Sequence, residues 1–326
     1  MAVHVFTVSE ENFRICIERG IVALPEPSEG NTHDNVFDGL VSRISGIKED
    51  DYVLIYIIKP KCTLCGVWQV EGQPFYEETQ IWEDRLYPFR CRIRWSEYKF
   101  NNPLILDSIN DLRNTGKIWT WALLRPATNR PNAMFSIADV EFRILLNEFM
   151  KINPYSMQRG IIQQPYPYHE NNLARHLHTC NGMPKYESTV MALLNTALSE
   201  GRFTELFGNY TDHLCYVPTN LGKEMDIMLI FDNPINRDTI VSFDIIEVNK
   251  ERFDLVALRQ LINYESWFIQ KKVFGDLNMV RTTAIAKTFS DDVIDYVRKR
   301  TAIENKPIKR LMYSFTNNTI ELNSVS

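Results

Sequence analysis

Several features that mark specialised protein classes are scarce or missing in this sequence. The 326 residues contain no apolar run of about 18 residues, so we expect no membrane-spanning helix. The six cysteines are scattered and do not predict a disulfide framework. The N-terminus lacks the basic start and long apolar core of a signal peptide, and we therefore expect a cytoplasmic protein. A net charge of −5 argues against a globally basic nucleic-acid-binding surface, but it leaves a local basic groove open.

The remaining composition, 44% apolar and 24% charged, is typical of a globular protein long enough for two domains. One stretch, residues 151–185, is rich in Pro, Tyr, Asn and Gln and has no sustained helix or strand period. We interpret residues 152–185 as a linker between an N-terminal domain at 1–151 and a C-terminal domain at 186–326.

The N-terminal part is dominated by short apolar or alternating runs that indicate β-strands. With few helices between them, these strands predict a small β-barrel. The expected strands are 4–8, 51–59, 66–70, 89–95 and 117–124, and the expected helices are 11–19, 106–113 and 136–151, the last with Ser136 as its N-cap.

The C-terminal part alternates helix and strand patterns, which predicts a mixed α/β sheet layered by helices. The sequence therefore predicts a two-domain protein of the α+β or α/β class. The expected helices are 186–205, 254–270 and 290–300, and the expected strands are 214–218, 225–231, 240–248, 279–285 and 310–314.

Two acidic residues stand at the ends of buried strands in the C-terminal part. Asp226 begins one strand and Glu247 lies near the end of the next, and a hairpin around 233–237 would bring both to one end of the sheet. Buried carboxylates are costly unless they are paired or bound to a metal, and oxygen ligands suit Mg²⁺ or Mn²⁺. The alternative is that both acids simply face solvent.

These acids belong to a larger pattern that resembles the PD-(D/E)XK nuclease fold, particularly its RecB-like branch. That family has an Asp on one strand, Glu-x-Lys on the next, and Gln-x-x-x-Tyr on the following helix. Asp226, Glu247 and the pair Gln260 and Tyr264 match these positions, and Glu187 occupies the place of an acid on the first helix.

The resemblance implies that Asp226, Glu247 and the backbone carbonyl of Val248 hold the metal ion. The family's lysine is replaced by Asn249. Because strand side chains alternate, Lys250 points away from the face of Glu247.

We consider two other lysines, Lys223 and Lys271, as sources of the missing charge. The alternative is a catalytically degenerate protein that binds nucleic acid without cutting it. For Gln260 and Tyr264, an ordinary helix face with satisfied polar groups also remains open.

The N-terminal 151 residues resemble the EVE domain, a PUA-like barrel related to YTH modules. The resemblance rests on the segments SRISGIKEDDYVLIYIIK, CGVWQVEGQPFYEE, IWEDRLYPFRCRIRW and FSIADVEFRILLNEF. Domains of this kind take a flipped or modified base into an aromatic pocket, where stacking on the rings replaces stacking on the neighbouring bases of the duplex. Trp68, Trp82 and Tyr87 are the expected wall residues. The alternative is that the tryptophans fill the core.

Three arginines, Arg90, Arg92 and Arg94, alternate along one predicted strand and share a face. Such a row could follow the phosphates of a nucleic acid or form the solvated face of an antiparallel strand.

Together the two resemblances imply a modification-dependent DNA endonuclease that uses Mg²⁺ or Mn²⁺ and acts on double-stranded DNA carrying a modified base. An RNA reader or processor is a further alternative. Related nucleases often dimerise, which leaves a homodimer open, and no membrane partner is expected.

Overall fold

A computed structural model describes residues 2–30, 32–126, 128–155, 162–167, 169, 172–236, 239–316 and 319–325. The chain divides into two compact units, Met1–His176 and Leu177–Ser326. In the described part of the chain, no helix is both long and apolar enough to cross a membrane.

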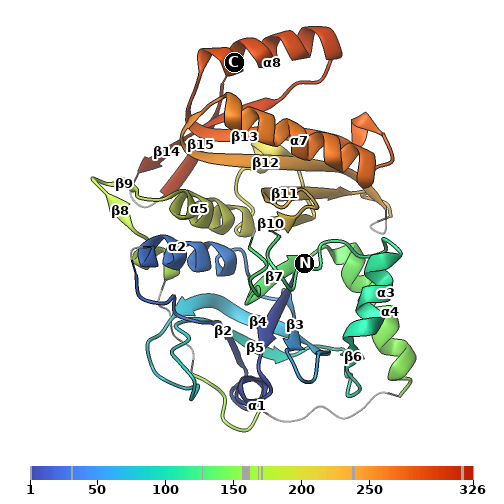
Figure 1. The fold of residues 1–326 in the computed structure, drawn as a ribbon. Helices are drawn as coiled ribbons and strands as arrows, with labels where there is room; N and C mark the ends of the chain where they lie inside the picture. Colours follow the sequence, from blue (N-terminus) through green and yellow to red (C-terminus); the bar gives the residue numbers. More distant parts are fainter. Residues whose placement is uncertain are drawn as a thin grey trace. The chain divides into compact units, whose positions relative to one another are not determined.

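Among its described residues, the first unit contains one mixed sheet and four α-helices (Figure 1). The strand order is β2-β5-β4-β3-β1-β7, with β6 paired to β4. The elements are β1 (Val3–Val8), α1 (Glu10–Arg19), β2 (Ile21–Leu24), α2 (His33–Ile44), β3 (Tyr52–Ile57), β4 (Thr63–Tyr76), β5 (Phe89–Trp95), β6 (Leu104–Ile105), α3 (Leu106–Asn114), β7 (Met134–Ile137), α4 (Asp139–Ile152) and the 3₁₀ turn η1 (Leu173–His176).

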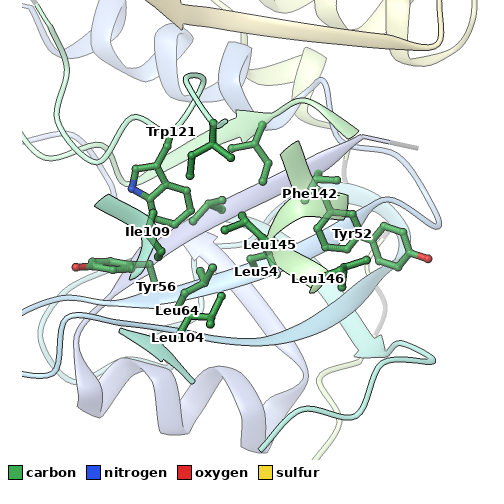
Figure 2. Packing of buried hydrophobic residues seen from close by; sticks show 14 of the residues in the cluster. Tyr52, Leu54, Tyr56, Leu64, Leu104, Ile109, Trp121, Phe142, Leu145 and Leu146 are labelled. Atoms are coloured by element: carbon green, nitrogen blue, oxygen red, sulfur yellow. The ribbon is translucent and has the colours of Figure 1, made fainter. Parts of the chain in front are cut away.

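The predicted closed barrel is not found among these described residues, because β2 and β7 stand at opposite ends of the strand order without pairing. Alternating patterns predict strands but do not fix closure, which depends on strand tilt and stagger. One face of the sheet instead packs against α3 and α4. Figure 2 shows Phe142, Leu145 and Leu146 of α4 in one cluster with residues of the central strands, including Tyr52 and Leu54.

Two predictions for this unit are wrong. Residues 117–124 do not form a strand, because the backbone N–H groups of Trp119 and Thr120 bond to the buried Glu141 carboxylate at 2.7 and 3.2 Å. Ser136 is not the N-cap of α4. It lies in β7, where it pairs with His4 of β1, and the helix begins at Asp139.

Part of the segment that we interpreted as a linker packs on the first unit. Tyr166 is 7% exposed and its ring stacks on Phe75 with centroids 6.1 Å apart. His169 lies 3.3 Å from the Glu77 carboxylate, and the His176 ring stacks on Tyr76 at 4.1 Å. These described residues therefore belong structurally to the unit that precedes them.

The second unit has the predicted mixed sheet with helices on it. Its strand order is β10-β11-β12-β13-β14-β15, and β8 and β9 form a separate two-stranded sheet. The elements are β8 (Thr179–Cys180), β9 (Met183–Pro184), α5 (Glu187–Ser199), α6 (Thr204–Phe207), β10 (Asp212–Pro218), β11 (Glu224–Asp232), β12 (Ile240–Phe253), α7 (Leu255–Lys271), the 3₁₀ turn η2 (Leu277–Met279), β13 (Val280–Phe289), α8 (Asp291–Glu304), β14 (Lys309–Thr316) and β15 (Thr319–Ser324).

Strand β12 is the long central element of this sheet. It runs antiparallel to β11 and parallel to β13, and α7 connects β12 to β13 and lies across both (Figure 1). The helix begins sharply because the Asp254 side chain accepts hydrogen bonds from the N–H groups of Val256 and Ala257. Apolar side chains of α5 pack with Ile246 and Val248 of β12. Residues of β12 that alternate with these two therefore face α7.

Candidate functional site

Asp226 and Glu247 lie on neighbouring antiparallel strands. The register pairs Ile227 of β11 with Ile246 of β12. Because the strands are antiparallel, Asp226, one residue before Ile227, lies opposite Glu247, one residue after Ile246. Opposite residues in such a pair project from the same face, with Cβ atoms about 4.5–5.5 Å apart. The antiparallel pairing predicted from the sequence is confirmed, and it brings the two carboxylates together on the face covered by α7.

The backbone of Val248 joins this site. Its N–H donates to Oδ2 of Asp226 at 2.8 Å, so a side chain takes the place of a backbone partner where the β11–β12 pairing ends. The N–H and C=O of a strand residue point to the same side. The Val248 carbonyl therefore points to the side of β12 on which the Asp226 carboxylate lies.

Glu247 is only 6% exposed. Its Oε1 accepts a hydrogen bond from Nε2 of Gln260 at 2.6 Å, whereas its Oε2 is buried with no hydrogen-bond partner. Burial raises the pKa of Glu247 far above its usual range, and repulsion from Asp226 and Glu187 raises it further. Burial likewise raises the pKa of Asp226, with a smaller contribution from Glu187. The two carboxylates thus oppose each other's ionisation.

Gln260 and Tyr264 of α7 hold the helix against this site. The Gln260 Oε1 accepts from the Lys223 ammonium at 2.5 Å, so the amide connects Lys223 to Glu247. The Tyr264 hydroxyl donates to the backbone carbonyl of Glu224 at 2.8 Å, and its ring is buried. Burial raises the pKa of Tyr264 well above its usual range, and the Glu247 and Asp226 charges add to this effect.

Glu187 is the first residue of α5, and its Oε2 accepts from the backbone N–H of Lys250 at 3.4 Å. Partial burial raises its pKa. Its charge also opposes the ionisation of Asp226 and Glu247, so three carboxylates influence one another here.

Asn249 stands where the resemblance to nucleases led us to expect a lysine. It is half-buried on β12, two residues after Glu247 and on the same face. The Lys250 ammonium lies 3.3 Å from the Glu251 carboxylate. Lys271 is exposed at the end of α7, three helical turns from Gln260.

The donor set fits a hard divalent cation. The available groups are two close carboxylates and the Val248 carbonyl, all oxygen ligands, and the buried Oε2 of Glu247 has an unused acceptor position. A cation there would relieve the repulsion that raises the pKa of both acids. Among the residues that the structure describes, no group of three or more His, Cys, Asp or Glu side chains is arranged to bind a metal.

In the first unit, Trp68 is part of the interior. Its side chain is 4% exposed and its ring lies 5.6 Å from Trp95 and 6.3 Å from Phe13. Gly66 has φ +43°, and a Cβ at this position would lie 2.5 Å from the Trp68 ring. The indole is therefore enclosed on several sides.

Arg90 forms the centre of a buried aromatic cluster. Its side chain is fully buried, and its guanidinium donates to the carbonyls of Tyr87 and Thr79 and to the Tyr166 hydroxyl at 2.7 Å. The Trp82 ring lies 5.5 Å from this guanidinium and is itself 2% exposed. Burial lowers the pKa of Arg90. The structure places Arg90 and Trp82 in the interior of the unit.

The other predicted residues of this unit are more accessible. Tyr87 is half-buried and its hydroxyl donates to Asp84 at 2.8 Å. The Arg92 guanidinium lies 2.8 Å from Glu71, and Arg94 pairs with Asp50. The three arginines thus do not form one open row.

A cleft that was not predicted from the sequence lies beside Gln260. Polar residues of the turn before β11 and further α7 residues line this cleft together with Gln260 and Lys271. The spacing of four, three and four residues along α7, from Gln260 through Tyr264 and Trp267 to Lys271, is the sequence signal for this shared helix face.

Comparison with known proteins gives similarities only at the level of solved structures, since no family model and no curated protein matches the chain. A YTH domain-containing protein, mmi1, in complex with RNA is 12% identical, with a TM-score of 0.30 over 47% of this chain and 87% of that one. The YTH domain of Zygosaccharomyces rouxii MRB1, in complex with N6-methyladenosine RNA, is 14% identical, with a TM-score of 0.28 over 45% and 86%. The apo form of EndoMS is 14% identical, with a TM-score of 0.22 over 32% of this chain and 38% of that one.

Proposed function

We propose that the second unit is a metal-dependent nuclease and that the first unit supplies nucleic-acid recognition, so that the chain acts as a modification-dependent DNA endonuclease. The observation that carries this proposal is the pair Asp226 and Glu247, with a buried Glu247 oxygen that has no hydrogen-bond partner. Without a cation, Lys223 and the Gln260 amide offset only part of the repulsion at Glu247, and the pKa of both acids stays raised. Acidic groups with strongly perturbed pKa values are typical of functional sites.

Asp226, Glu247 and the Val248 carbonyl would hold Mg²⁺ or Mn²⁺. The ion would polarise the scissile phosphate and lower the pKa of an attacking water molecule. Gln260 fixes the orientation of Glu247 through its 2.6 Å hydrogen bond. Tyr264 anchors α7 to the beginning of β11 through the Glu224 carbonyl.

Lys223 is the best candidate for the positive charge that Asn249 does not carry. Its ammonium bonds to Gln260, one residue away from Glu247 in the hydrogen-bond chain, and its charge favours the ionised form of Glu247. Lys271 lies about 16 Å further along α7, at 1.5 Å per residue. A cation near the phosphate stabilises the charge that develops during phosphodiester hydrolysis.

Recognition by the first unit rests on its accessible residues. Arg94 is exposed on β5, and Tyr87 and Arg92 are half-buried. The Arg85 guanidinium lies 5.4 Å from the centre of the Tyr87 ring. An aromatic ring next to a guanidinium group can stack a base while the cation contacts a phosphate. The buried Trp68, Trp82 and Arg90 would support this surface from below.

Asn249 favours a second candidate, a nuclease fold that binds nucleic acid without cutting it. An asparagine can orient a water molecule, but it cannot offset negative charge. The two candidates differ in whether a divalent cation produces cleavage.

The test compares double-stranded DNA with and without modified bases, and RNA, in the presence of Mg²⁺, Mn²⁺ or EDTA. We expect cation-dependent cutting of modified DNA. Asp226→Asn and Glu247→Gln should abolish cutting and leave binding largely intact.

Lys223→Ala should slow cutting by about 10²-fold, as expected for loss of one transition-state donor. At saturating DNA, where weaker binding does not lower the rate, the matched control Lys271→Ala should change the rate much less. Binding without cutting under every cation supports the second candidate, and preferential action on RNA supports an RNA processor. Wild-type cutting by both carboxylate variants contradicts the nuclease proposal.

A further inference from the structure

The second unit contains an open cleft of about 710 Å³ next to the carboxylate site. This volume lies within the range of about 300–1,000 Å³ that is usual for small-ligand sites. One wall is a continuous face of α7, and the other is the turn between β10 and β11. The lining residues are Asn220, Leu221, Lys223, Gln260, Asn263, Tyr264, Ser266, Trp267, Gln270 and Lys271.

The chemistry of this lining suits a nucleoside. Asn220, Asn263 and Gln270 are exposed and carry amides, which offer both donors and acceptors to the edge of a base. Trp267 contributes a half-buried indole, and stacking of a base on an aromatic ring is possible for any base. The Lys272 ammonium lies 5.5 Å from the Trp267 ring centroid, which adds positive charge close to the indole.

Both walls of the cleft are fixed by hydrogen bonds. The Thr219 hydroxyl donates to the Lys223 carbonyl at 2.7 Å and accepts from the Leu221 N–H at 3.2 Å. Across the cleft, the Tyr264 hydroxyl bonds to the Glu224 carbonyl. A ligand therefore meets a largely preformed site and loses little affinity to ordering of the protein.

The cleft begins at Gln260, whose amide contacts Glu247, and ends at Lys271. Along α7 these two residues are separated by about 16 Å. A strand lying in the cleft would have one phosphate beside the carboxylates and a neighbouring nucleotide beside Trp267.

We propose that this cleft binds an unpaired nucleotide of the DNA strand that the carboxylate site cuts, with its base stacked on Trp267 and a flanking phosphate next to Lys271. The link to cutting rests on the proposed nuclease function, whereas base binding does not. A base inside a duplex cannot reach the indole, so the strand must be single or locally opened. The substrate class is therefore single-stranded DNA or a duplex opened at the cut.

Binding of a short DNA single strand, measured by fluorescence anisotropy in EDTA, tests this proposal without any cleavage. An abasic residue is placed at each position of the strand in turn. We expect wild-type protein to lose about 5- to 150-fold in affinity at one position, the range for one stacked base. Trp267→Ala should bind the intact strand as weakly as wild type binds that abasic strand, and it should not distinguish the two.

Phe274→Ala is the matched control, because Phe274 is 94% exposed and does not line the cleft. It should bind like wild type. Should Trp267→Ala fail to fold, the abasic series on wild-type protein still tests whether one base of the strand contributes to binding.

The proposal is overturned if no abasic position matters, if Trp267→Ala weakens both strands equally, or if an RNA strand binds more tightly than the DNA strand. Because the assay contains no divalent cation, an inactive nuclease can still pass it and an active one can still fail it.

Discussion

Replacing Asp226 by Asn should stabilise the cation-free protein, and the gain should grow with pH. Burial raises the Asp226 pKa from 3.8 to about 7, with added repulsion from Glu187. Between these two values the folded protein retains a proton that the unfolded chain has released, so the free energy of unfolding falls as pH rises. Asparagine has no proton to lose, and its side-chain oxygen can still accept from the Val248 N–H.

The size of the effect follows from the shift of about three pKa units. At about 1.4 kcal/mol per unit, the full cost of ionising Asp226 in the folded state is about 4 kcal/mol. Coupling to Glu247 spreads part of this cost over both acids, so about 2–4 kcal/mol is expected for one substitution above pH 7. Below about pH 4 the wild-type protein and the variant should have similar stability.

Urea unfolding in EDTA at a series of pH values measures this difference. Asp244→Asn is a matched control, because burial also raises the Asp244 pKa, to about 6, but its carboxylate bonds to Thr283 and not to the site. Adding Mg²⁺ or Mn²⁺ should then stabilise wild type and Asp244→Asn by mass action and leave Asp226→Asn unaffected.

The reasoning is refuted if Asp226→Asn follows the same pH profile as wild type. Equal stabilisation of Asp226→Asn and wild type by the cation would separately refute its role as a ligand. A shift in Asp244→Asn alone would mean that Asp244 is the acid that controls the pH dependence.

Two further predictions concern the first unit. Arg90→Lys should lower the free energy of unfolding of this unit by about 2–3 kcal/mol, because one ammonium cannot replace the forked hydrogen bonds to Tyr87 and Tyr166. The control Arg94→Lys, at an exposed position, should change it by less than about 1 kcal/mol. Denaturant unfolding measures both. Cleavage at a protease site inserted at 177–182 should give two folded pieces, detected by size-exclusion chromatography and circular dichroism. Cleavage within 162–167 should instead lower the melting temperature of the first unit. Equal effects of both cuts would contradict the packing of Tyr166.

The order of elements in the second unit was predictable because its signals are local. Strand 240–248 and helix 254–270 were expected from apolar periodicity. The helix occurs at Leu255–Lys271, whereas strand β12 continues five residues beyond the predicted end, to Phe253. The positions of Asp226 and Glu247 followed from an antiparallel hairpin. The Lys223–Gln260 contact joins residues 37 apart, so the sequence could offer Lys223 and Lys271 only as alternatives.

In the first unit, several predictions from local sequence patterns were wrong because contacts between residues distant in sequence determine the structure there. Alternation placed Arg90 with Arg92 and Arg94, but Tyr166, 76 residues later, covers Arg90. The strand predicted at 117–124 failed because a distant carboxylate satisfies its backbone. Helix α2 was missed because Thr32 makes no side-chain cap and Gly39 interrupts the helical pattern.

The amide of Gln260 has two ends that cannot be exchanged. Its nitrogen faces a carboxylate and its oxygen faces an ammonium, so rotating the amide by half a turn would set donor against donor and acceptor against acceptor. Lys223 withdraws electron density from the amide and thereby makes its N–H a stronger donor to Glu247. A glutamate of the same size would satisfy Lys223 and repel Glu247, and a lysine would do the reverse. Neither a negative nor a positive side chain therefore fits at position 260. Through the neutral amide of Gln260, the Lys223 ammonium acts on Glu247 without contacting it.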